Sequence, residues 1–501
     1  MTTDERPVST AYDELVDRYR RATYLGDANA VLSWDQEVMM PEGGTQARSK
    51  QRSAVSAAQH DILVDEETGE LLSELTDAAL SNEKSAVIRE IRREHERKVR
   101  VPTELVEQLT EATSKAHPVW AEARESDDFD RFAPTLEELV ELKREYAEYI
   151  DPNADPYATL FADYEPYLDL ETADRVLEEL REGLVPLIEA IGDSETEPYA
   201  IDGAYPEDDQ FELTREALST LGYDFEHGRV DTAPHPFSTG TQFDARVTTR
   251  FDQSSPLDSL ASTIHEFGHA SYTLGLPRER YGTPLGEHRG LTVHESQSRL
   301  FENHVGRSEP FWELFVDRFN EQHSTDLTAR RAYEAANQVY EDNLIRVEAD
   351  ELTYHLHIIL RFEIERELFA DELAVEEIPD IWNDRMEAYL GVRPEGDGEG
   401  CLQDIHWSHG SFGYFPTYSL GSVLAAQLYA AAEEAIDGLE SKIASGEFED
   451  LHRWLEEEIH RHGRRYTTDE LIERATGEPL TAEYFLEYAE AKFGELYDLD
   501  R

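Results

Sequence analysis

The chain has 501 residues and carries 109 Asp and Glu against 46 Lys and Arg, a formal net charge of −63. A chain this negative repels nucleic-acid phosphate and anionic membrane surfaces, so we expect neither a nucleic-acid partner nor a membrane partner. Hydrophobic residues still make up 39% of the sequence and aromatic residues 10%, enough apolar mass for a large core, which argues against disorder.

The acidic residues are spread along the whole chain, whereas acidic interaction proteins usually concentrate them in a tail. In molar salt the Debye length falls to about 3 Å, so dense acidic groups barely repel one another. The composition therefore favours a halophilic protein, with an acidic interaction protein as the alternative. Cys401 is the only cysteine, which favours a cytoplasmic location, with an extracellular halophilic protein as the alternative.

Apolar residues recur at helical spacing through most of the chain and predict helices at 10–26, 43–66, 85–113, 128–150, 171–192, 348–372 and 448–461. No repeat and no low-complexity linker divides the sequence. We therefore predict a mostly α fold, a single large helical body over 1–501. Within it we distinguish a helical N-terminal part at about 1–225, a catalytic part at about 226–430 and a helical C-terminal part at about 431–501.

The stretch 230–252 departs from this helical pattern. It contains β-branched residues, a glycine at a turn and a short alternation of apolar and polar positions, which predict a small β-hairpin. The next segment, 257–276, has helical spacing again and contains His265-Glu266-Phe267-Gly268-His269. We therefore expect a small sheet beside a helix that carries two histidines.

Positions i and i+4 share one face of a helix, so His265 and His269 can bind a single metal ion. Glu266 is then close enough to take a proton from a water at that ion, the arrangement of zinc peptidases. The alternative is two solvated histidines, which the apolar, small-residue character of this helix weakens. A catalytic zinc needs a third protein ligand. Glu295 is our candidate, after a connection rich in Gly and Pro, and His294 competes with it.

The 28 residues from Ile405 to Ala432 contain no charged side chain. A buried helix explains 424–432. The stretch from Ile405 to Tyr418, IHWSHGSFGYFPTY, is polar, aromatic and rich in glycine, and suits the wall of a binding cleft. We call Ile405–Tyr418 the wall segment.

These motifs together resemble the carboxypeptidase Taq family of thermostable zinc metallocarboxypeptidases. HEFGH followed by HESQSR carries the resemblance, and the N-terminal LSWDQEVMMPEGG also resembles the family's opening. Four further segments match in order: His235–Phe237 (HPF), Asp244–Thr248 (DARVT), Ile345–Asp350 (IRVEAD) and Gly400–Trp407 (GCLQDIHW).

The resemblance implies that His265, His269 and Glu295 are the metal ligands and that Glu266 is the general base and acid. It also implies one Zn²⁺ per chain, replaceable by Co²⁺, and release of C-terminal residues from peptides with broad specificity. The implied fold is a helical body with a deep active-site groove, usually a homodimer.

A carboxypeptidase must hold the substrate's terminal carboxylate, preferably with the planar fork of an arginine. Arg346 and Arg246 are our candidates. In the alternative, each braces the fold by pairing with a nearby acid such as Asp244 or Asp350.

The tetrahedral intermediate needs a further donor for its oxyanion. His406, Tyr414 and Tyr418 are candidates, with simple packing as the alternative for each. His235 is another candidate polar group near the substrate. Asp350 and Asp404 are candidates to accept a proton from the free nitrogens of the ligand histidines.

The sequence thus predicts a zinc-dependent metallocarboxypeptidase that acts on peptides. A zinc endo-oligopeptidase shares the histidine helix but needs no site for a terminal carboxylate. The alternative that is not an enzyme is an acidic scaffold protein with a decayed site.

Overall fold

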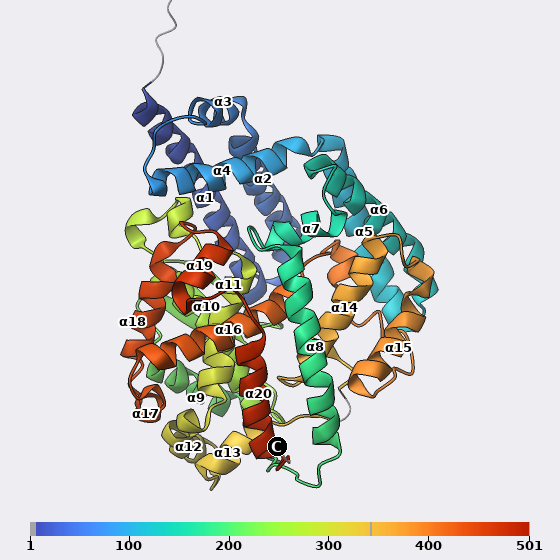
Figure 1. The fold of residues 1–501 in the computed structure, drawn as a ribbon, viewed down its shortest axis with the longest axis vertical. Coiled ribbons are helices and arrows are strands. Elements are labelled where there is room, and N and C mark those ends of the chain that lie inside the picture. Colours follow the sequence, from blue (N-terminus) through green and yellow to red (C-terminus); the bar gives the residue numbers. More distant parts are fainter. Residues whose placement is uncertain (1–6, 341–342, 500–501) are drawn as a thin grey trace, which may run out of the picture.

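Helices dominate the computed structural model, which describes residues 7–340 and 343–499 (Figure 1). The helices before the sheet are α1 (Val8–Val38), α2 (Thr45–Val64), α3 (Glu66–Glu74), α4 (Asn82–Arg100), α5 (Thr103–Ser126), α6 (Ala133–Ile150), α7 (Pro156–Tyr164), α8 (Leu170–Gly192) and α9 (Glu207–Thr220). Those from the sheet to the wall segment are α10 (Pro256–Gly275), α11 (Leu291–Arg299), α12 (Glu309–His323), α13 (Ala329–Ala336), α14 (Thr353–Phe369) and α15 (Ile378–Leu390).

The last helices are α16 (Pro416–Ala435), α17 (Leu439–Ala444), α18 (Glu449–Glu458), α19 (Thr468–Thr476) and α20 (Glu483–Leu496). A π-helix, η5 (Leu300–Gly306), continues α11 directly. The 3-10 turns are η1 (Glu42–Gly44), η2 (Phe129–Arg131), η3 (Arg278–Arg280), η4 (Pro284–Gly286), η6 (Arg346–Glu348), η7 (Val375–Glu377), η8 (His406–His409) and η9 (His460–His462).

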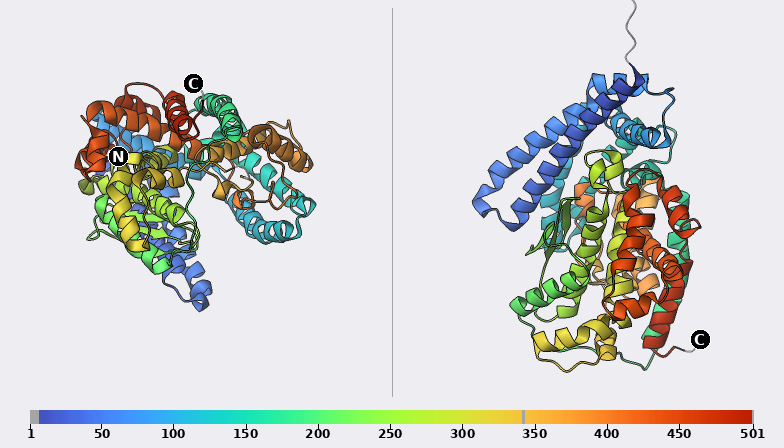
Figure 2. Two further views of the ribbon diagram at one scale, coloured as in Figure 1. Left: turned by 90° about the horizontal axis from the view of Figure 1, so that it is seen from below. Right: turned by 90° about the vertical axis from the view of Figure 1, so that its left-hand side faces the viewer.

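Most predicted helices are present, with different boundaries. The helix expected at 85–113 is two helices, α4 and α5, because Pro102 disfavours helical backbone at Val101. The first helix runs on to Val38, and with α2 it forms an antiparallel pair that extends beyond the rest of the molecule (Figure 2). Only Leu63 of α2 is buried, so α2 contributes little to the core, whereas α1 buries residues such as Leu15 and Tyr19.

The predicted hairpin is part of a three-stranded sheet with the order β1-β3-β2. Strands β2 (Ser238–Thr241) and β3 (Asp244–Thr249) form the antiparallel hairpin, with Thr241 opposite Asp244. The sequence did not predict that β1 (Gly228–Thr232) would be a separate strand, parallel to β3. Residues 233–237 between β1 and β2 allow β1 to cross to the far side of β3.

Helix α11 is held between α10 and α16, and glycine permits the contact on each side. A Cβ at Gly268 of α10 would lie 2.4 Å from the backbone oxygen of Gln297. A Cβ at Gly421 of α16 would lie 2.4 Å from Cγ of Glu295. The two glycines therefore let the three helices approach closely enough to fix Glu295 beside the histidines of α10.

The largest cluster of buried apolar residues draws on the chain from Ala112 to Tyr497, and a smaller cluster joins α1, α3 and α4. Long helices such as α8 and α20 lie side by side over the large cluster (Figure 1). The division at about 225 and 430 stays a prediction. In the described parts of the chain, no helix combines the length and the apolar character that a membrane crossing requires.

Candidate metal centre and active site

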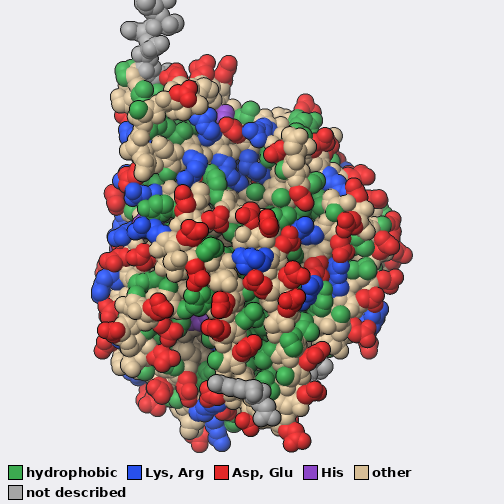
Figure 3. Space-filling view, viewed as in Figure 1, with side chains coloured by type: hydrophobic (Ala, Val, Ile, Leu, Met, Phe, Trp, Pro, Cys, Tyr) green, Lys and Arg blue, Asp and Glu red, His purple; other side chains and the backbone are tan. Residues whose placement is uncertain are grey.

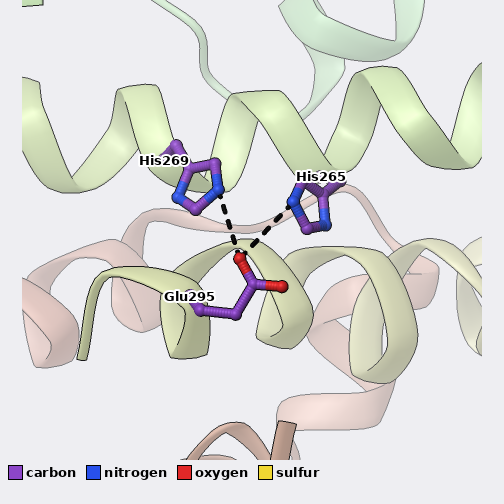
Figure 4. Close-up of side chains that lie close together, drawn as sticks. All are labelled: His265, His269 and Glu295. Carbon is purple, nitrogen blue, oxygen red and sulfur yellow. Dashed lines mark ion pairs between the residues drawn. The ribbon is translucent and has the colours of Figure 1, made fainter. Parts of the chain in front are cut away.

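His265 and His269 project from one face of α10, one turn apart, toward Glu295 of α11 (Figure 4). Oε2 of Glu295 lies 3.6 Å from Nε2 of His265 and 3.4 Å from Nε2 of His269. The ligand atoms of these three residues all lie within 4.8 Å of one another, and no other such group occurs among the described residues. The structure thus brings together the three side chains that the sequence nominated.

The second nitrogen of each histidine ring has its own partner. Nδ1 of His265 donates to Oε2 of Glu302 at 2.9 Å, and Nδ1 of His269 donates to the backbone oxygen of His294 at 3.1 Å. A proton held at Nδ1 leaves the lone pair of Nε2 free in both rings. Both rings are therefore oriented as metal ligands.

Two arginines hold the acidic side chains of the centre in place. Arg299 donates to Oε1 of Glu295 at 2.8 Å and to Oε2 of Glu302 at 3.1 Å, and Arg307 lies 3.3 Å from Oε1 of Glu302. Burial alone would raise the pKa of Glu295, but the neighbouring His265 and Arg299 side chains hold it well below its usual value. Burial also opposes ionisation of Glu302, but the Arg299 charge and the hydrogen bond from His265 hold its pKa well below the usual value, so both carboxylates are ionised at neutral pH.

The donor set fits a divalent metal ion. A tetrahedral zinc site has ligand atoms at about 2.0–2.2 Å from the ion, which places neighbouring ligands about 3.3–3.6 Å apart. The distances of 3.4 and 3.6 Å from the two Nε2 atoms to Oε2 of Glu295 lie within this range. Two neutral imidazoles and one carboxylate also leave a fourth position open, as a catalytic site requires.

Glu266 follows His265 on α10 and is 7% exposed. Burial raises its pKa above the usual value; His265 and His269 oppose this rise, and Glu295 reinforces it. The side chain is thus within electrostatic reach of all three candidate ligands without being one of them. A carboxyl group with a raised pKa is a stronger base than an exposed one, which suits it to proton transfer.

His294, the competing ligand, has a different position. Its ring stacks on the His269 ring, with the centroids 4.3 Å apart, and its backbone oxygen is the acceptor for that histidine. Beyond it, the His288 ring lies 4.5 Å from the His294 ring. His294 therefore packs behind His269, and Glu295 is the residue of the two whose side chain lies within reach of both histidines.

Arg346 lies in η6 and is 7% exposed. Its guanidinium forms an ion pair with Asp404 at 2.8 Å and donates to the Tyr354 hydroxyl at 3.1 Å. The Tyr354 ring in turn lies over Arg299, which holds Glu295. A chain of contacts thus connects Arg346 to the metal centre through Tyr354.

The three aromatic candidates of the wall segment gather around Arg346. The Tyr418 ring centroid lies 5.6 Å from the Arg346 guanidinium and 5.2 Å from the Tyr414 ring, which lies 5.7 Å from the His406 ring. Burial, followed by the charge of Glu295 among other groups, raises the pKa of Tyr414, so its hydroxyl stays protonated. Burial lowers the pKa of His406 to about 4, so this ring is neutral at pH 7.

Arg246 and His235 lie elsewhere. Arg246 pairs with Asp244 at 2.6 Å and lies 4.2 Å from the Trp34 ring, so the structure places it in a brace between β3 and α1. Arg229 contacts the same ring at 5.0 Å. His235 is exposed in the connection between β1 and β2. Neither residue contacts the three candidate ligands.

The expected second-layer roles of Asp350 and Asp404 differ from what the structure shows. Asp350 accepts the backbone N–H groups at the start of α14 and the Asn343 amide, and Asp404 pairs with Arg346 and Arg361. Glu302 and the His294 backbone oxygen take those roles instead. Glu302 follows Glu295 by seven residues, a spacing that returns to one helix face and could have identified it.

A cavity of about 710 Å³ opens on the His294 side of the histidine pair. Residues of α1, α4, β2, α10 and α11 line it, among them Asp27, Arg93, Thr239, Thr273 and His294. The three candidate ligands and Glu266 do not line this cavity, so it lies beside the metal centre, behind the His294 ring that stacks on His269.

Comparison with known proteins identifies the family of this chain. The family model described as carboxypeptidase Taq (M32) metallopeptidase matches residues 14–493. Thermostable carboxypeptidase 1 of Thermus thermophilus is 38% identical, covering 97% of this chain and 99% of its own, and carboxypeptidase 1 of Bacillus subtilis is 35% identical, covering 98% and 99%.

Among solved structures, an M32 carboxypeptidase from Deinococcus radiodurans R1 superposes with a TM-score of 0.94 at 38% identity, covering 98% of this chain and 100% of its own. Pyrococcus furiosus carboxypeptidase superposes with a TM-score of 0.93 at 36% identity, covering 96% and 99%. Sequence, fold and the His265–His269–Glu295 centre agree, and the chain belongs to the carboxypeptidase Taq (M32) family of metallopeptidases.

Proposed function

We propose that this protein is a zinc-dependent metallocarboxypeptidase that releases C-terminal residues from peptides with broad specificity. The observation that carries the proposal is the convergence of His265, His269 and Glu295, with both histidines oriented through Nδ1 so that Nε2 faces one point. Family membership supplies the reaction class.

Zn²⁺ is the proposed ion, with Co²⁺ as a possible substitute, because two imidazoles and a carboxylate are the ligand set of catalytic zinc sites. When bound, the ion supplies Lewis acidity toward the scissile carbonyl and the attacking water. The chain supplies the ligands, their orientation and a buried setting that strengthens each charge interaction.

Glu266 is the proposed general base and acid. It takes a proton from the attacking water at its carboxylate and delivers it to the nitrogen of the departing amino acid. Its burial raises the pKa of the carboxyl group, which makes this group a stronger base toward the attacking water than an exposed glutamate.

Arg346 is the proposed binding residue for the terminal carboxylate. It is the candidate arginine connected to the metal centre through Tyr354, whereas Arg246 is paired with Asp244 beside Trp34. His406, Tyr414 and Tyr418 surround Arg346 and are the proposed donors to the substrate and the oxyanion.

Two peptides that differ only at the C-terminus test this function. With zinc-loaded protein in molar KCl, a free C-terminus should lose residues one at a time, and the amidated peptide should stay intact. Cleavage inside both peptides would favour the zinc endo-oligopeptidase. Failure of the wild type to cleave either peptide would favour the scaffold. The variant E266Q is the control, and unaltered activity there would refute the assigned base.

We also propose a homodimer in the cytoplasm. The resemblance to the family supports the dimer, and the lone Cys401, which is buried and unpaired, is compatible with a reducing compartment. Sedimentation of the purified protein in molar KCl tests the dimer, because a monomer of 57.3 kDa would contradict it.

A further inference from the structure

Glu365 of α14 is a buried carboxylate outside the metal centre, with no exposed surface. It accepts three hydrogen bonds: from the Trp407 indole Nε1 at 2.8 Å, from the Gly413 backbone nitrogen at 2.9 Å and from the Tyr157 hydroxyl at 2.9 Å. Its three donors come from two places in the chain, α7 and the wall segment.

The two donors from the wall segment flank its functional candidates. Trp407 directly follows His406, and Gly413 directly precedes Tyr414. Gly413 has a φ of +81°, and a Cβ there would lie 2.7 Å from the backbone nitrogen of Phe161 in α7. The segment between the two contacts is therefore pressed against α7 and tied to α14 by Glu365.

Helix α14 also holds the residue just before the wall segment. Arg361 lies one turn before Glu365 and pairs with Asp404 at 2.6 Å, and Asp404 in turn holds Arg346. Arg361 and Glu365, four residues apart on α14, thus hold three residues of the neighbouring chain against one helix: Asp404, Trp407 and Gly413. This arrangement connects the terminal-carboxylate site and the aromatic donors to a single rigid element.

The identity of residue 365 matters because all three of its partners donate. A carboxylate offers acceptor sites on both oxygens, whereas a glutamine offers one acceptor oxygen and two N–H donors. A glutamine that kept the Gly413 and Tyr157 contacts would point its N–H group at the Trp407 N–H. Two buried donors would then face each other, which displaces the backbone next to His406.

We propose that Glu365 is a positioning residue, which sets the wall segment so that His406 and Tyr414 meet the substrate at Arg346. This inference rests on the proposed function, because it assigns His406 and Tyr414 to the substrate side of the site. Glu365 itself touches no substrate.

The variants E365Q, W407F and E365Q/W407F test the proposal. E365Q should lower kcat/KM by about 10²-fold, the cost of misplacing a group near the reaction by about 1 Å, and should leave one zinc per chain. The double variant removes the facing N–H and should regain at least ~10-fold over E365Q. A kcat/KM for E365Q within twofold of the wild type would overturn the proposal, as would a double variant below E365Q.

Should E365Q fail to fold, the pair W407F and Y157F replaces it. Tyr157 donates to the same carboxylate from α7, outside the wall segment. W407F should lower kcat/KM by ~10-fold and Y157F by less than ~3-fold. Equal losses, or the larger loss in Y157F, would overturn the assignment.

Crystal structures of the wild type and E365Q separate this proposal from the proposed function. They should show His406 and Tyr414 displaced by about 1 Å in E365Q, with His265, His269 and Glu295 unmoved. Unmoved wall-segment side chains would overturn the positioning role even if the wild type proved inactive on peptides.

Discussion

At the scale of single residues, the metal centre depends on side chains that never touch the ion. Glu302 accepts from His265 at 2.9 Å and is held by Arg299 and Arg307. This arrangement fixes both the ring orientation and the protonated nitrogen of His265. The same logic applies at Arg346, whose guanidinium is oriented by Asp404 and Tyr354 before any substrate arrives.

The variant E302Q should bind zinc about 10–100-fold more weakly than the wild type, because an outer partner of a ligand histidine contributes about that factor to metal affinity. Competition with a chelator of known affinity measures the change. E313Q is the matched control, because Glu313 is exposed on α12, and this variant should bind zinc as the wild type does. Equal affinities for E302Q and E313Q would contradict the assigned role.

R346K should raise KM about 10-fold and lower kcat less, because lysine keeps the charge but loses the planar fork that holds a carboxylate at two points. R366K is the control, since Arg366 lies on α14 and pairs with Asp174 of α8, outside the carboxylate site. Steady-state kinetics on one peptide give KM and kcat for the wild type, R346K and R366K. A KM for R346K equal to that of R366K would remove Arg346 from the carboxylate site.

At the scale of elements, the site is made by the close packing of α10, α11 and α16. Local sequence predicted part of this. The sequence predicted the histidine pair and Glu295, because both depend on local patterns. His265 and His269 have i, i+4 spacing, and a turn-rich connection leads from them to Glu295. Glu302 was not recognised, although its seven-residue spacing from Glu295 was a usable signal. Tyr354 could not be recognised, because its role arises from packing between distant segments.

The same reasoning explains the partial success with the sheet. The β2–β3 hairpin is a local structure with a short turn, and the sequence predicted it. The parallel partner β1 pairs through a crossover, and no local pattern specifies which side of β3 it takes. Asp350 and Asp404 were likewise placed near the centre by their motifs, while their actual partners lie in α14 and η6.

G421A should disturb the metal centre without touching it, because a Cβ at position 421 would lie 2.4 Å from Cγ of Glu295. Zinc affinity and kcat/KM should both fall by at least ~10-fold, as α16 moves off α11. G494A in α20 is the matched control. A Cβ there meets no atom within 4 Å, so this variant should be as active as the wild type and slightly more stable. Unchanged zinc binding in G421A would show that Gly421 is not required for the contact.

At the scale of the whole molecule, acidic side chains cover much of the surface in view (Figure 3). The net charge of −63 destabilises the folded state through self-repulsion unless salt screens it. The site is built in the opposite way: Arg299, Arg307, Arg346 and Arg361 are gathered around a few acids in the interior. The stability of the acidic surface thus depends on the salt concentration of the solvent, whereas the buried arginines neutralise the acids of the site.

The melting temperature should therefore rise by on the order of 10 °C between 0.1 and 3 M KCl, since the Debye length falls from about 10 Å to below 3 Å over that range. Differential scanning calorimetry measures this rise. Sucrose at matched osmolality is the control, because it does not screen charge. An equal rise in sucrose, or no rise in KCl, would contradict the role assigned to the acidic surface.

The most direct test of the central claim is anomalous diffraction at the zinc absorption edge from crystals of the zinc-loaded protein. We predict one strong peak per chain, about 2.0–2.2 Å from Nε2 of His265, Nε2 of His269 and a carboxylate oxygen of Glu295. A peak at other residues, or an active protein with no peak at these three, would contradict the account.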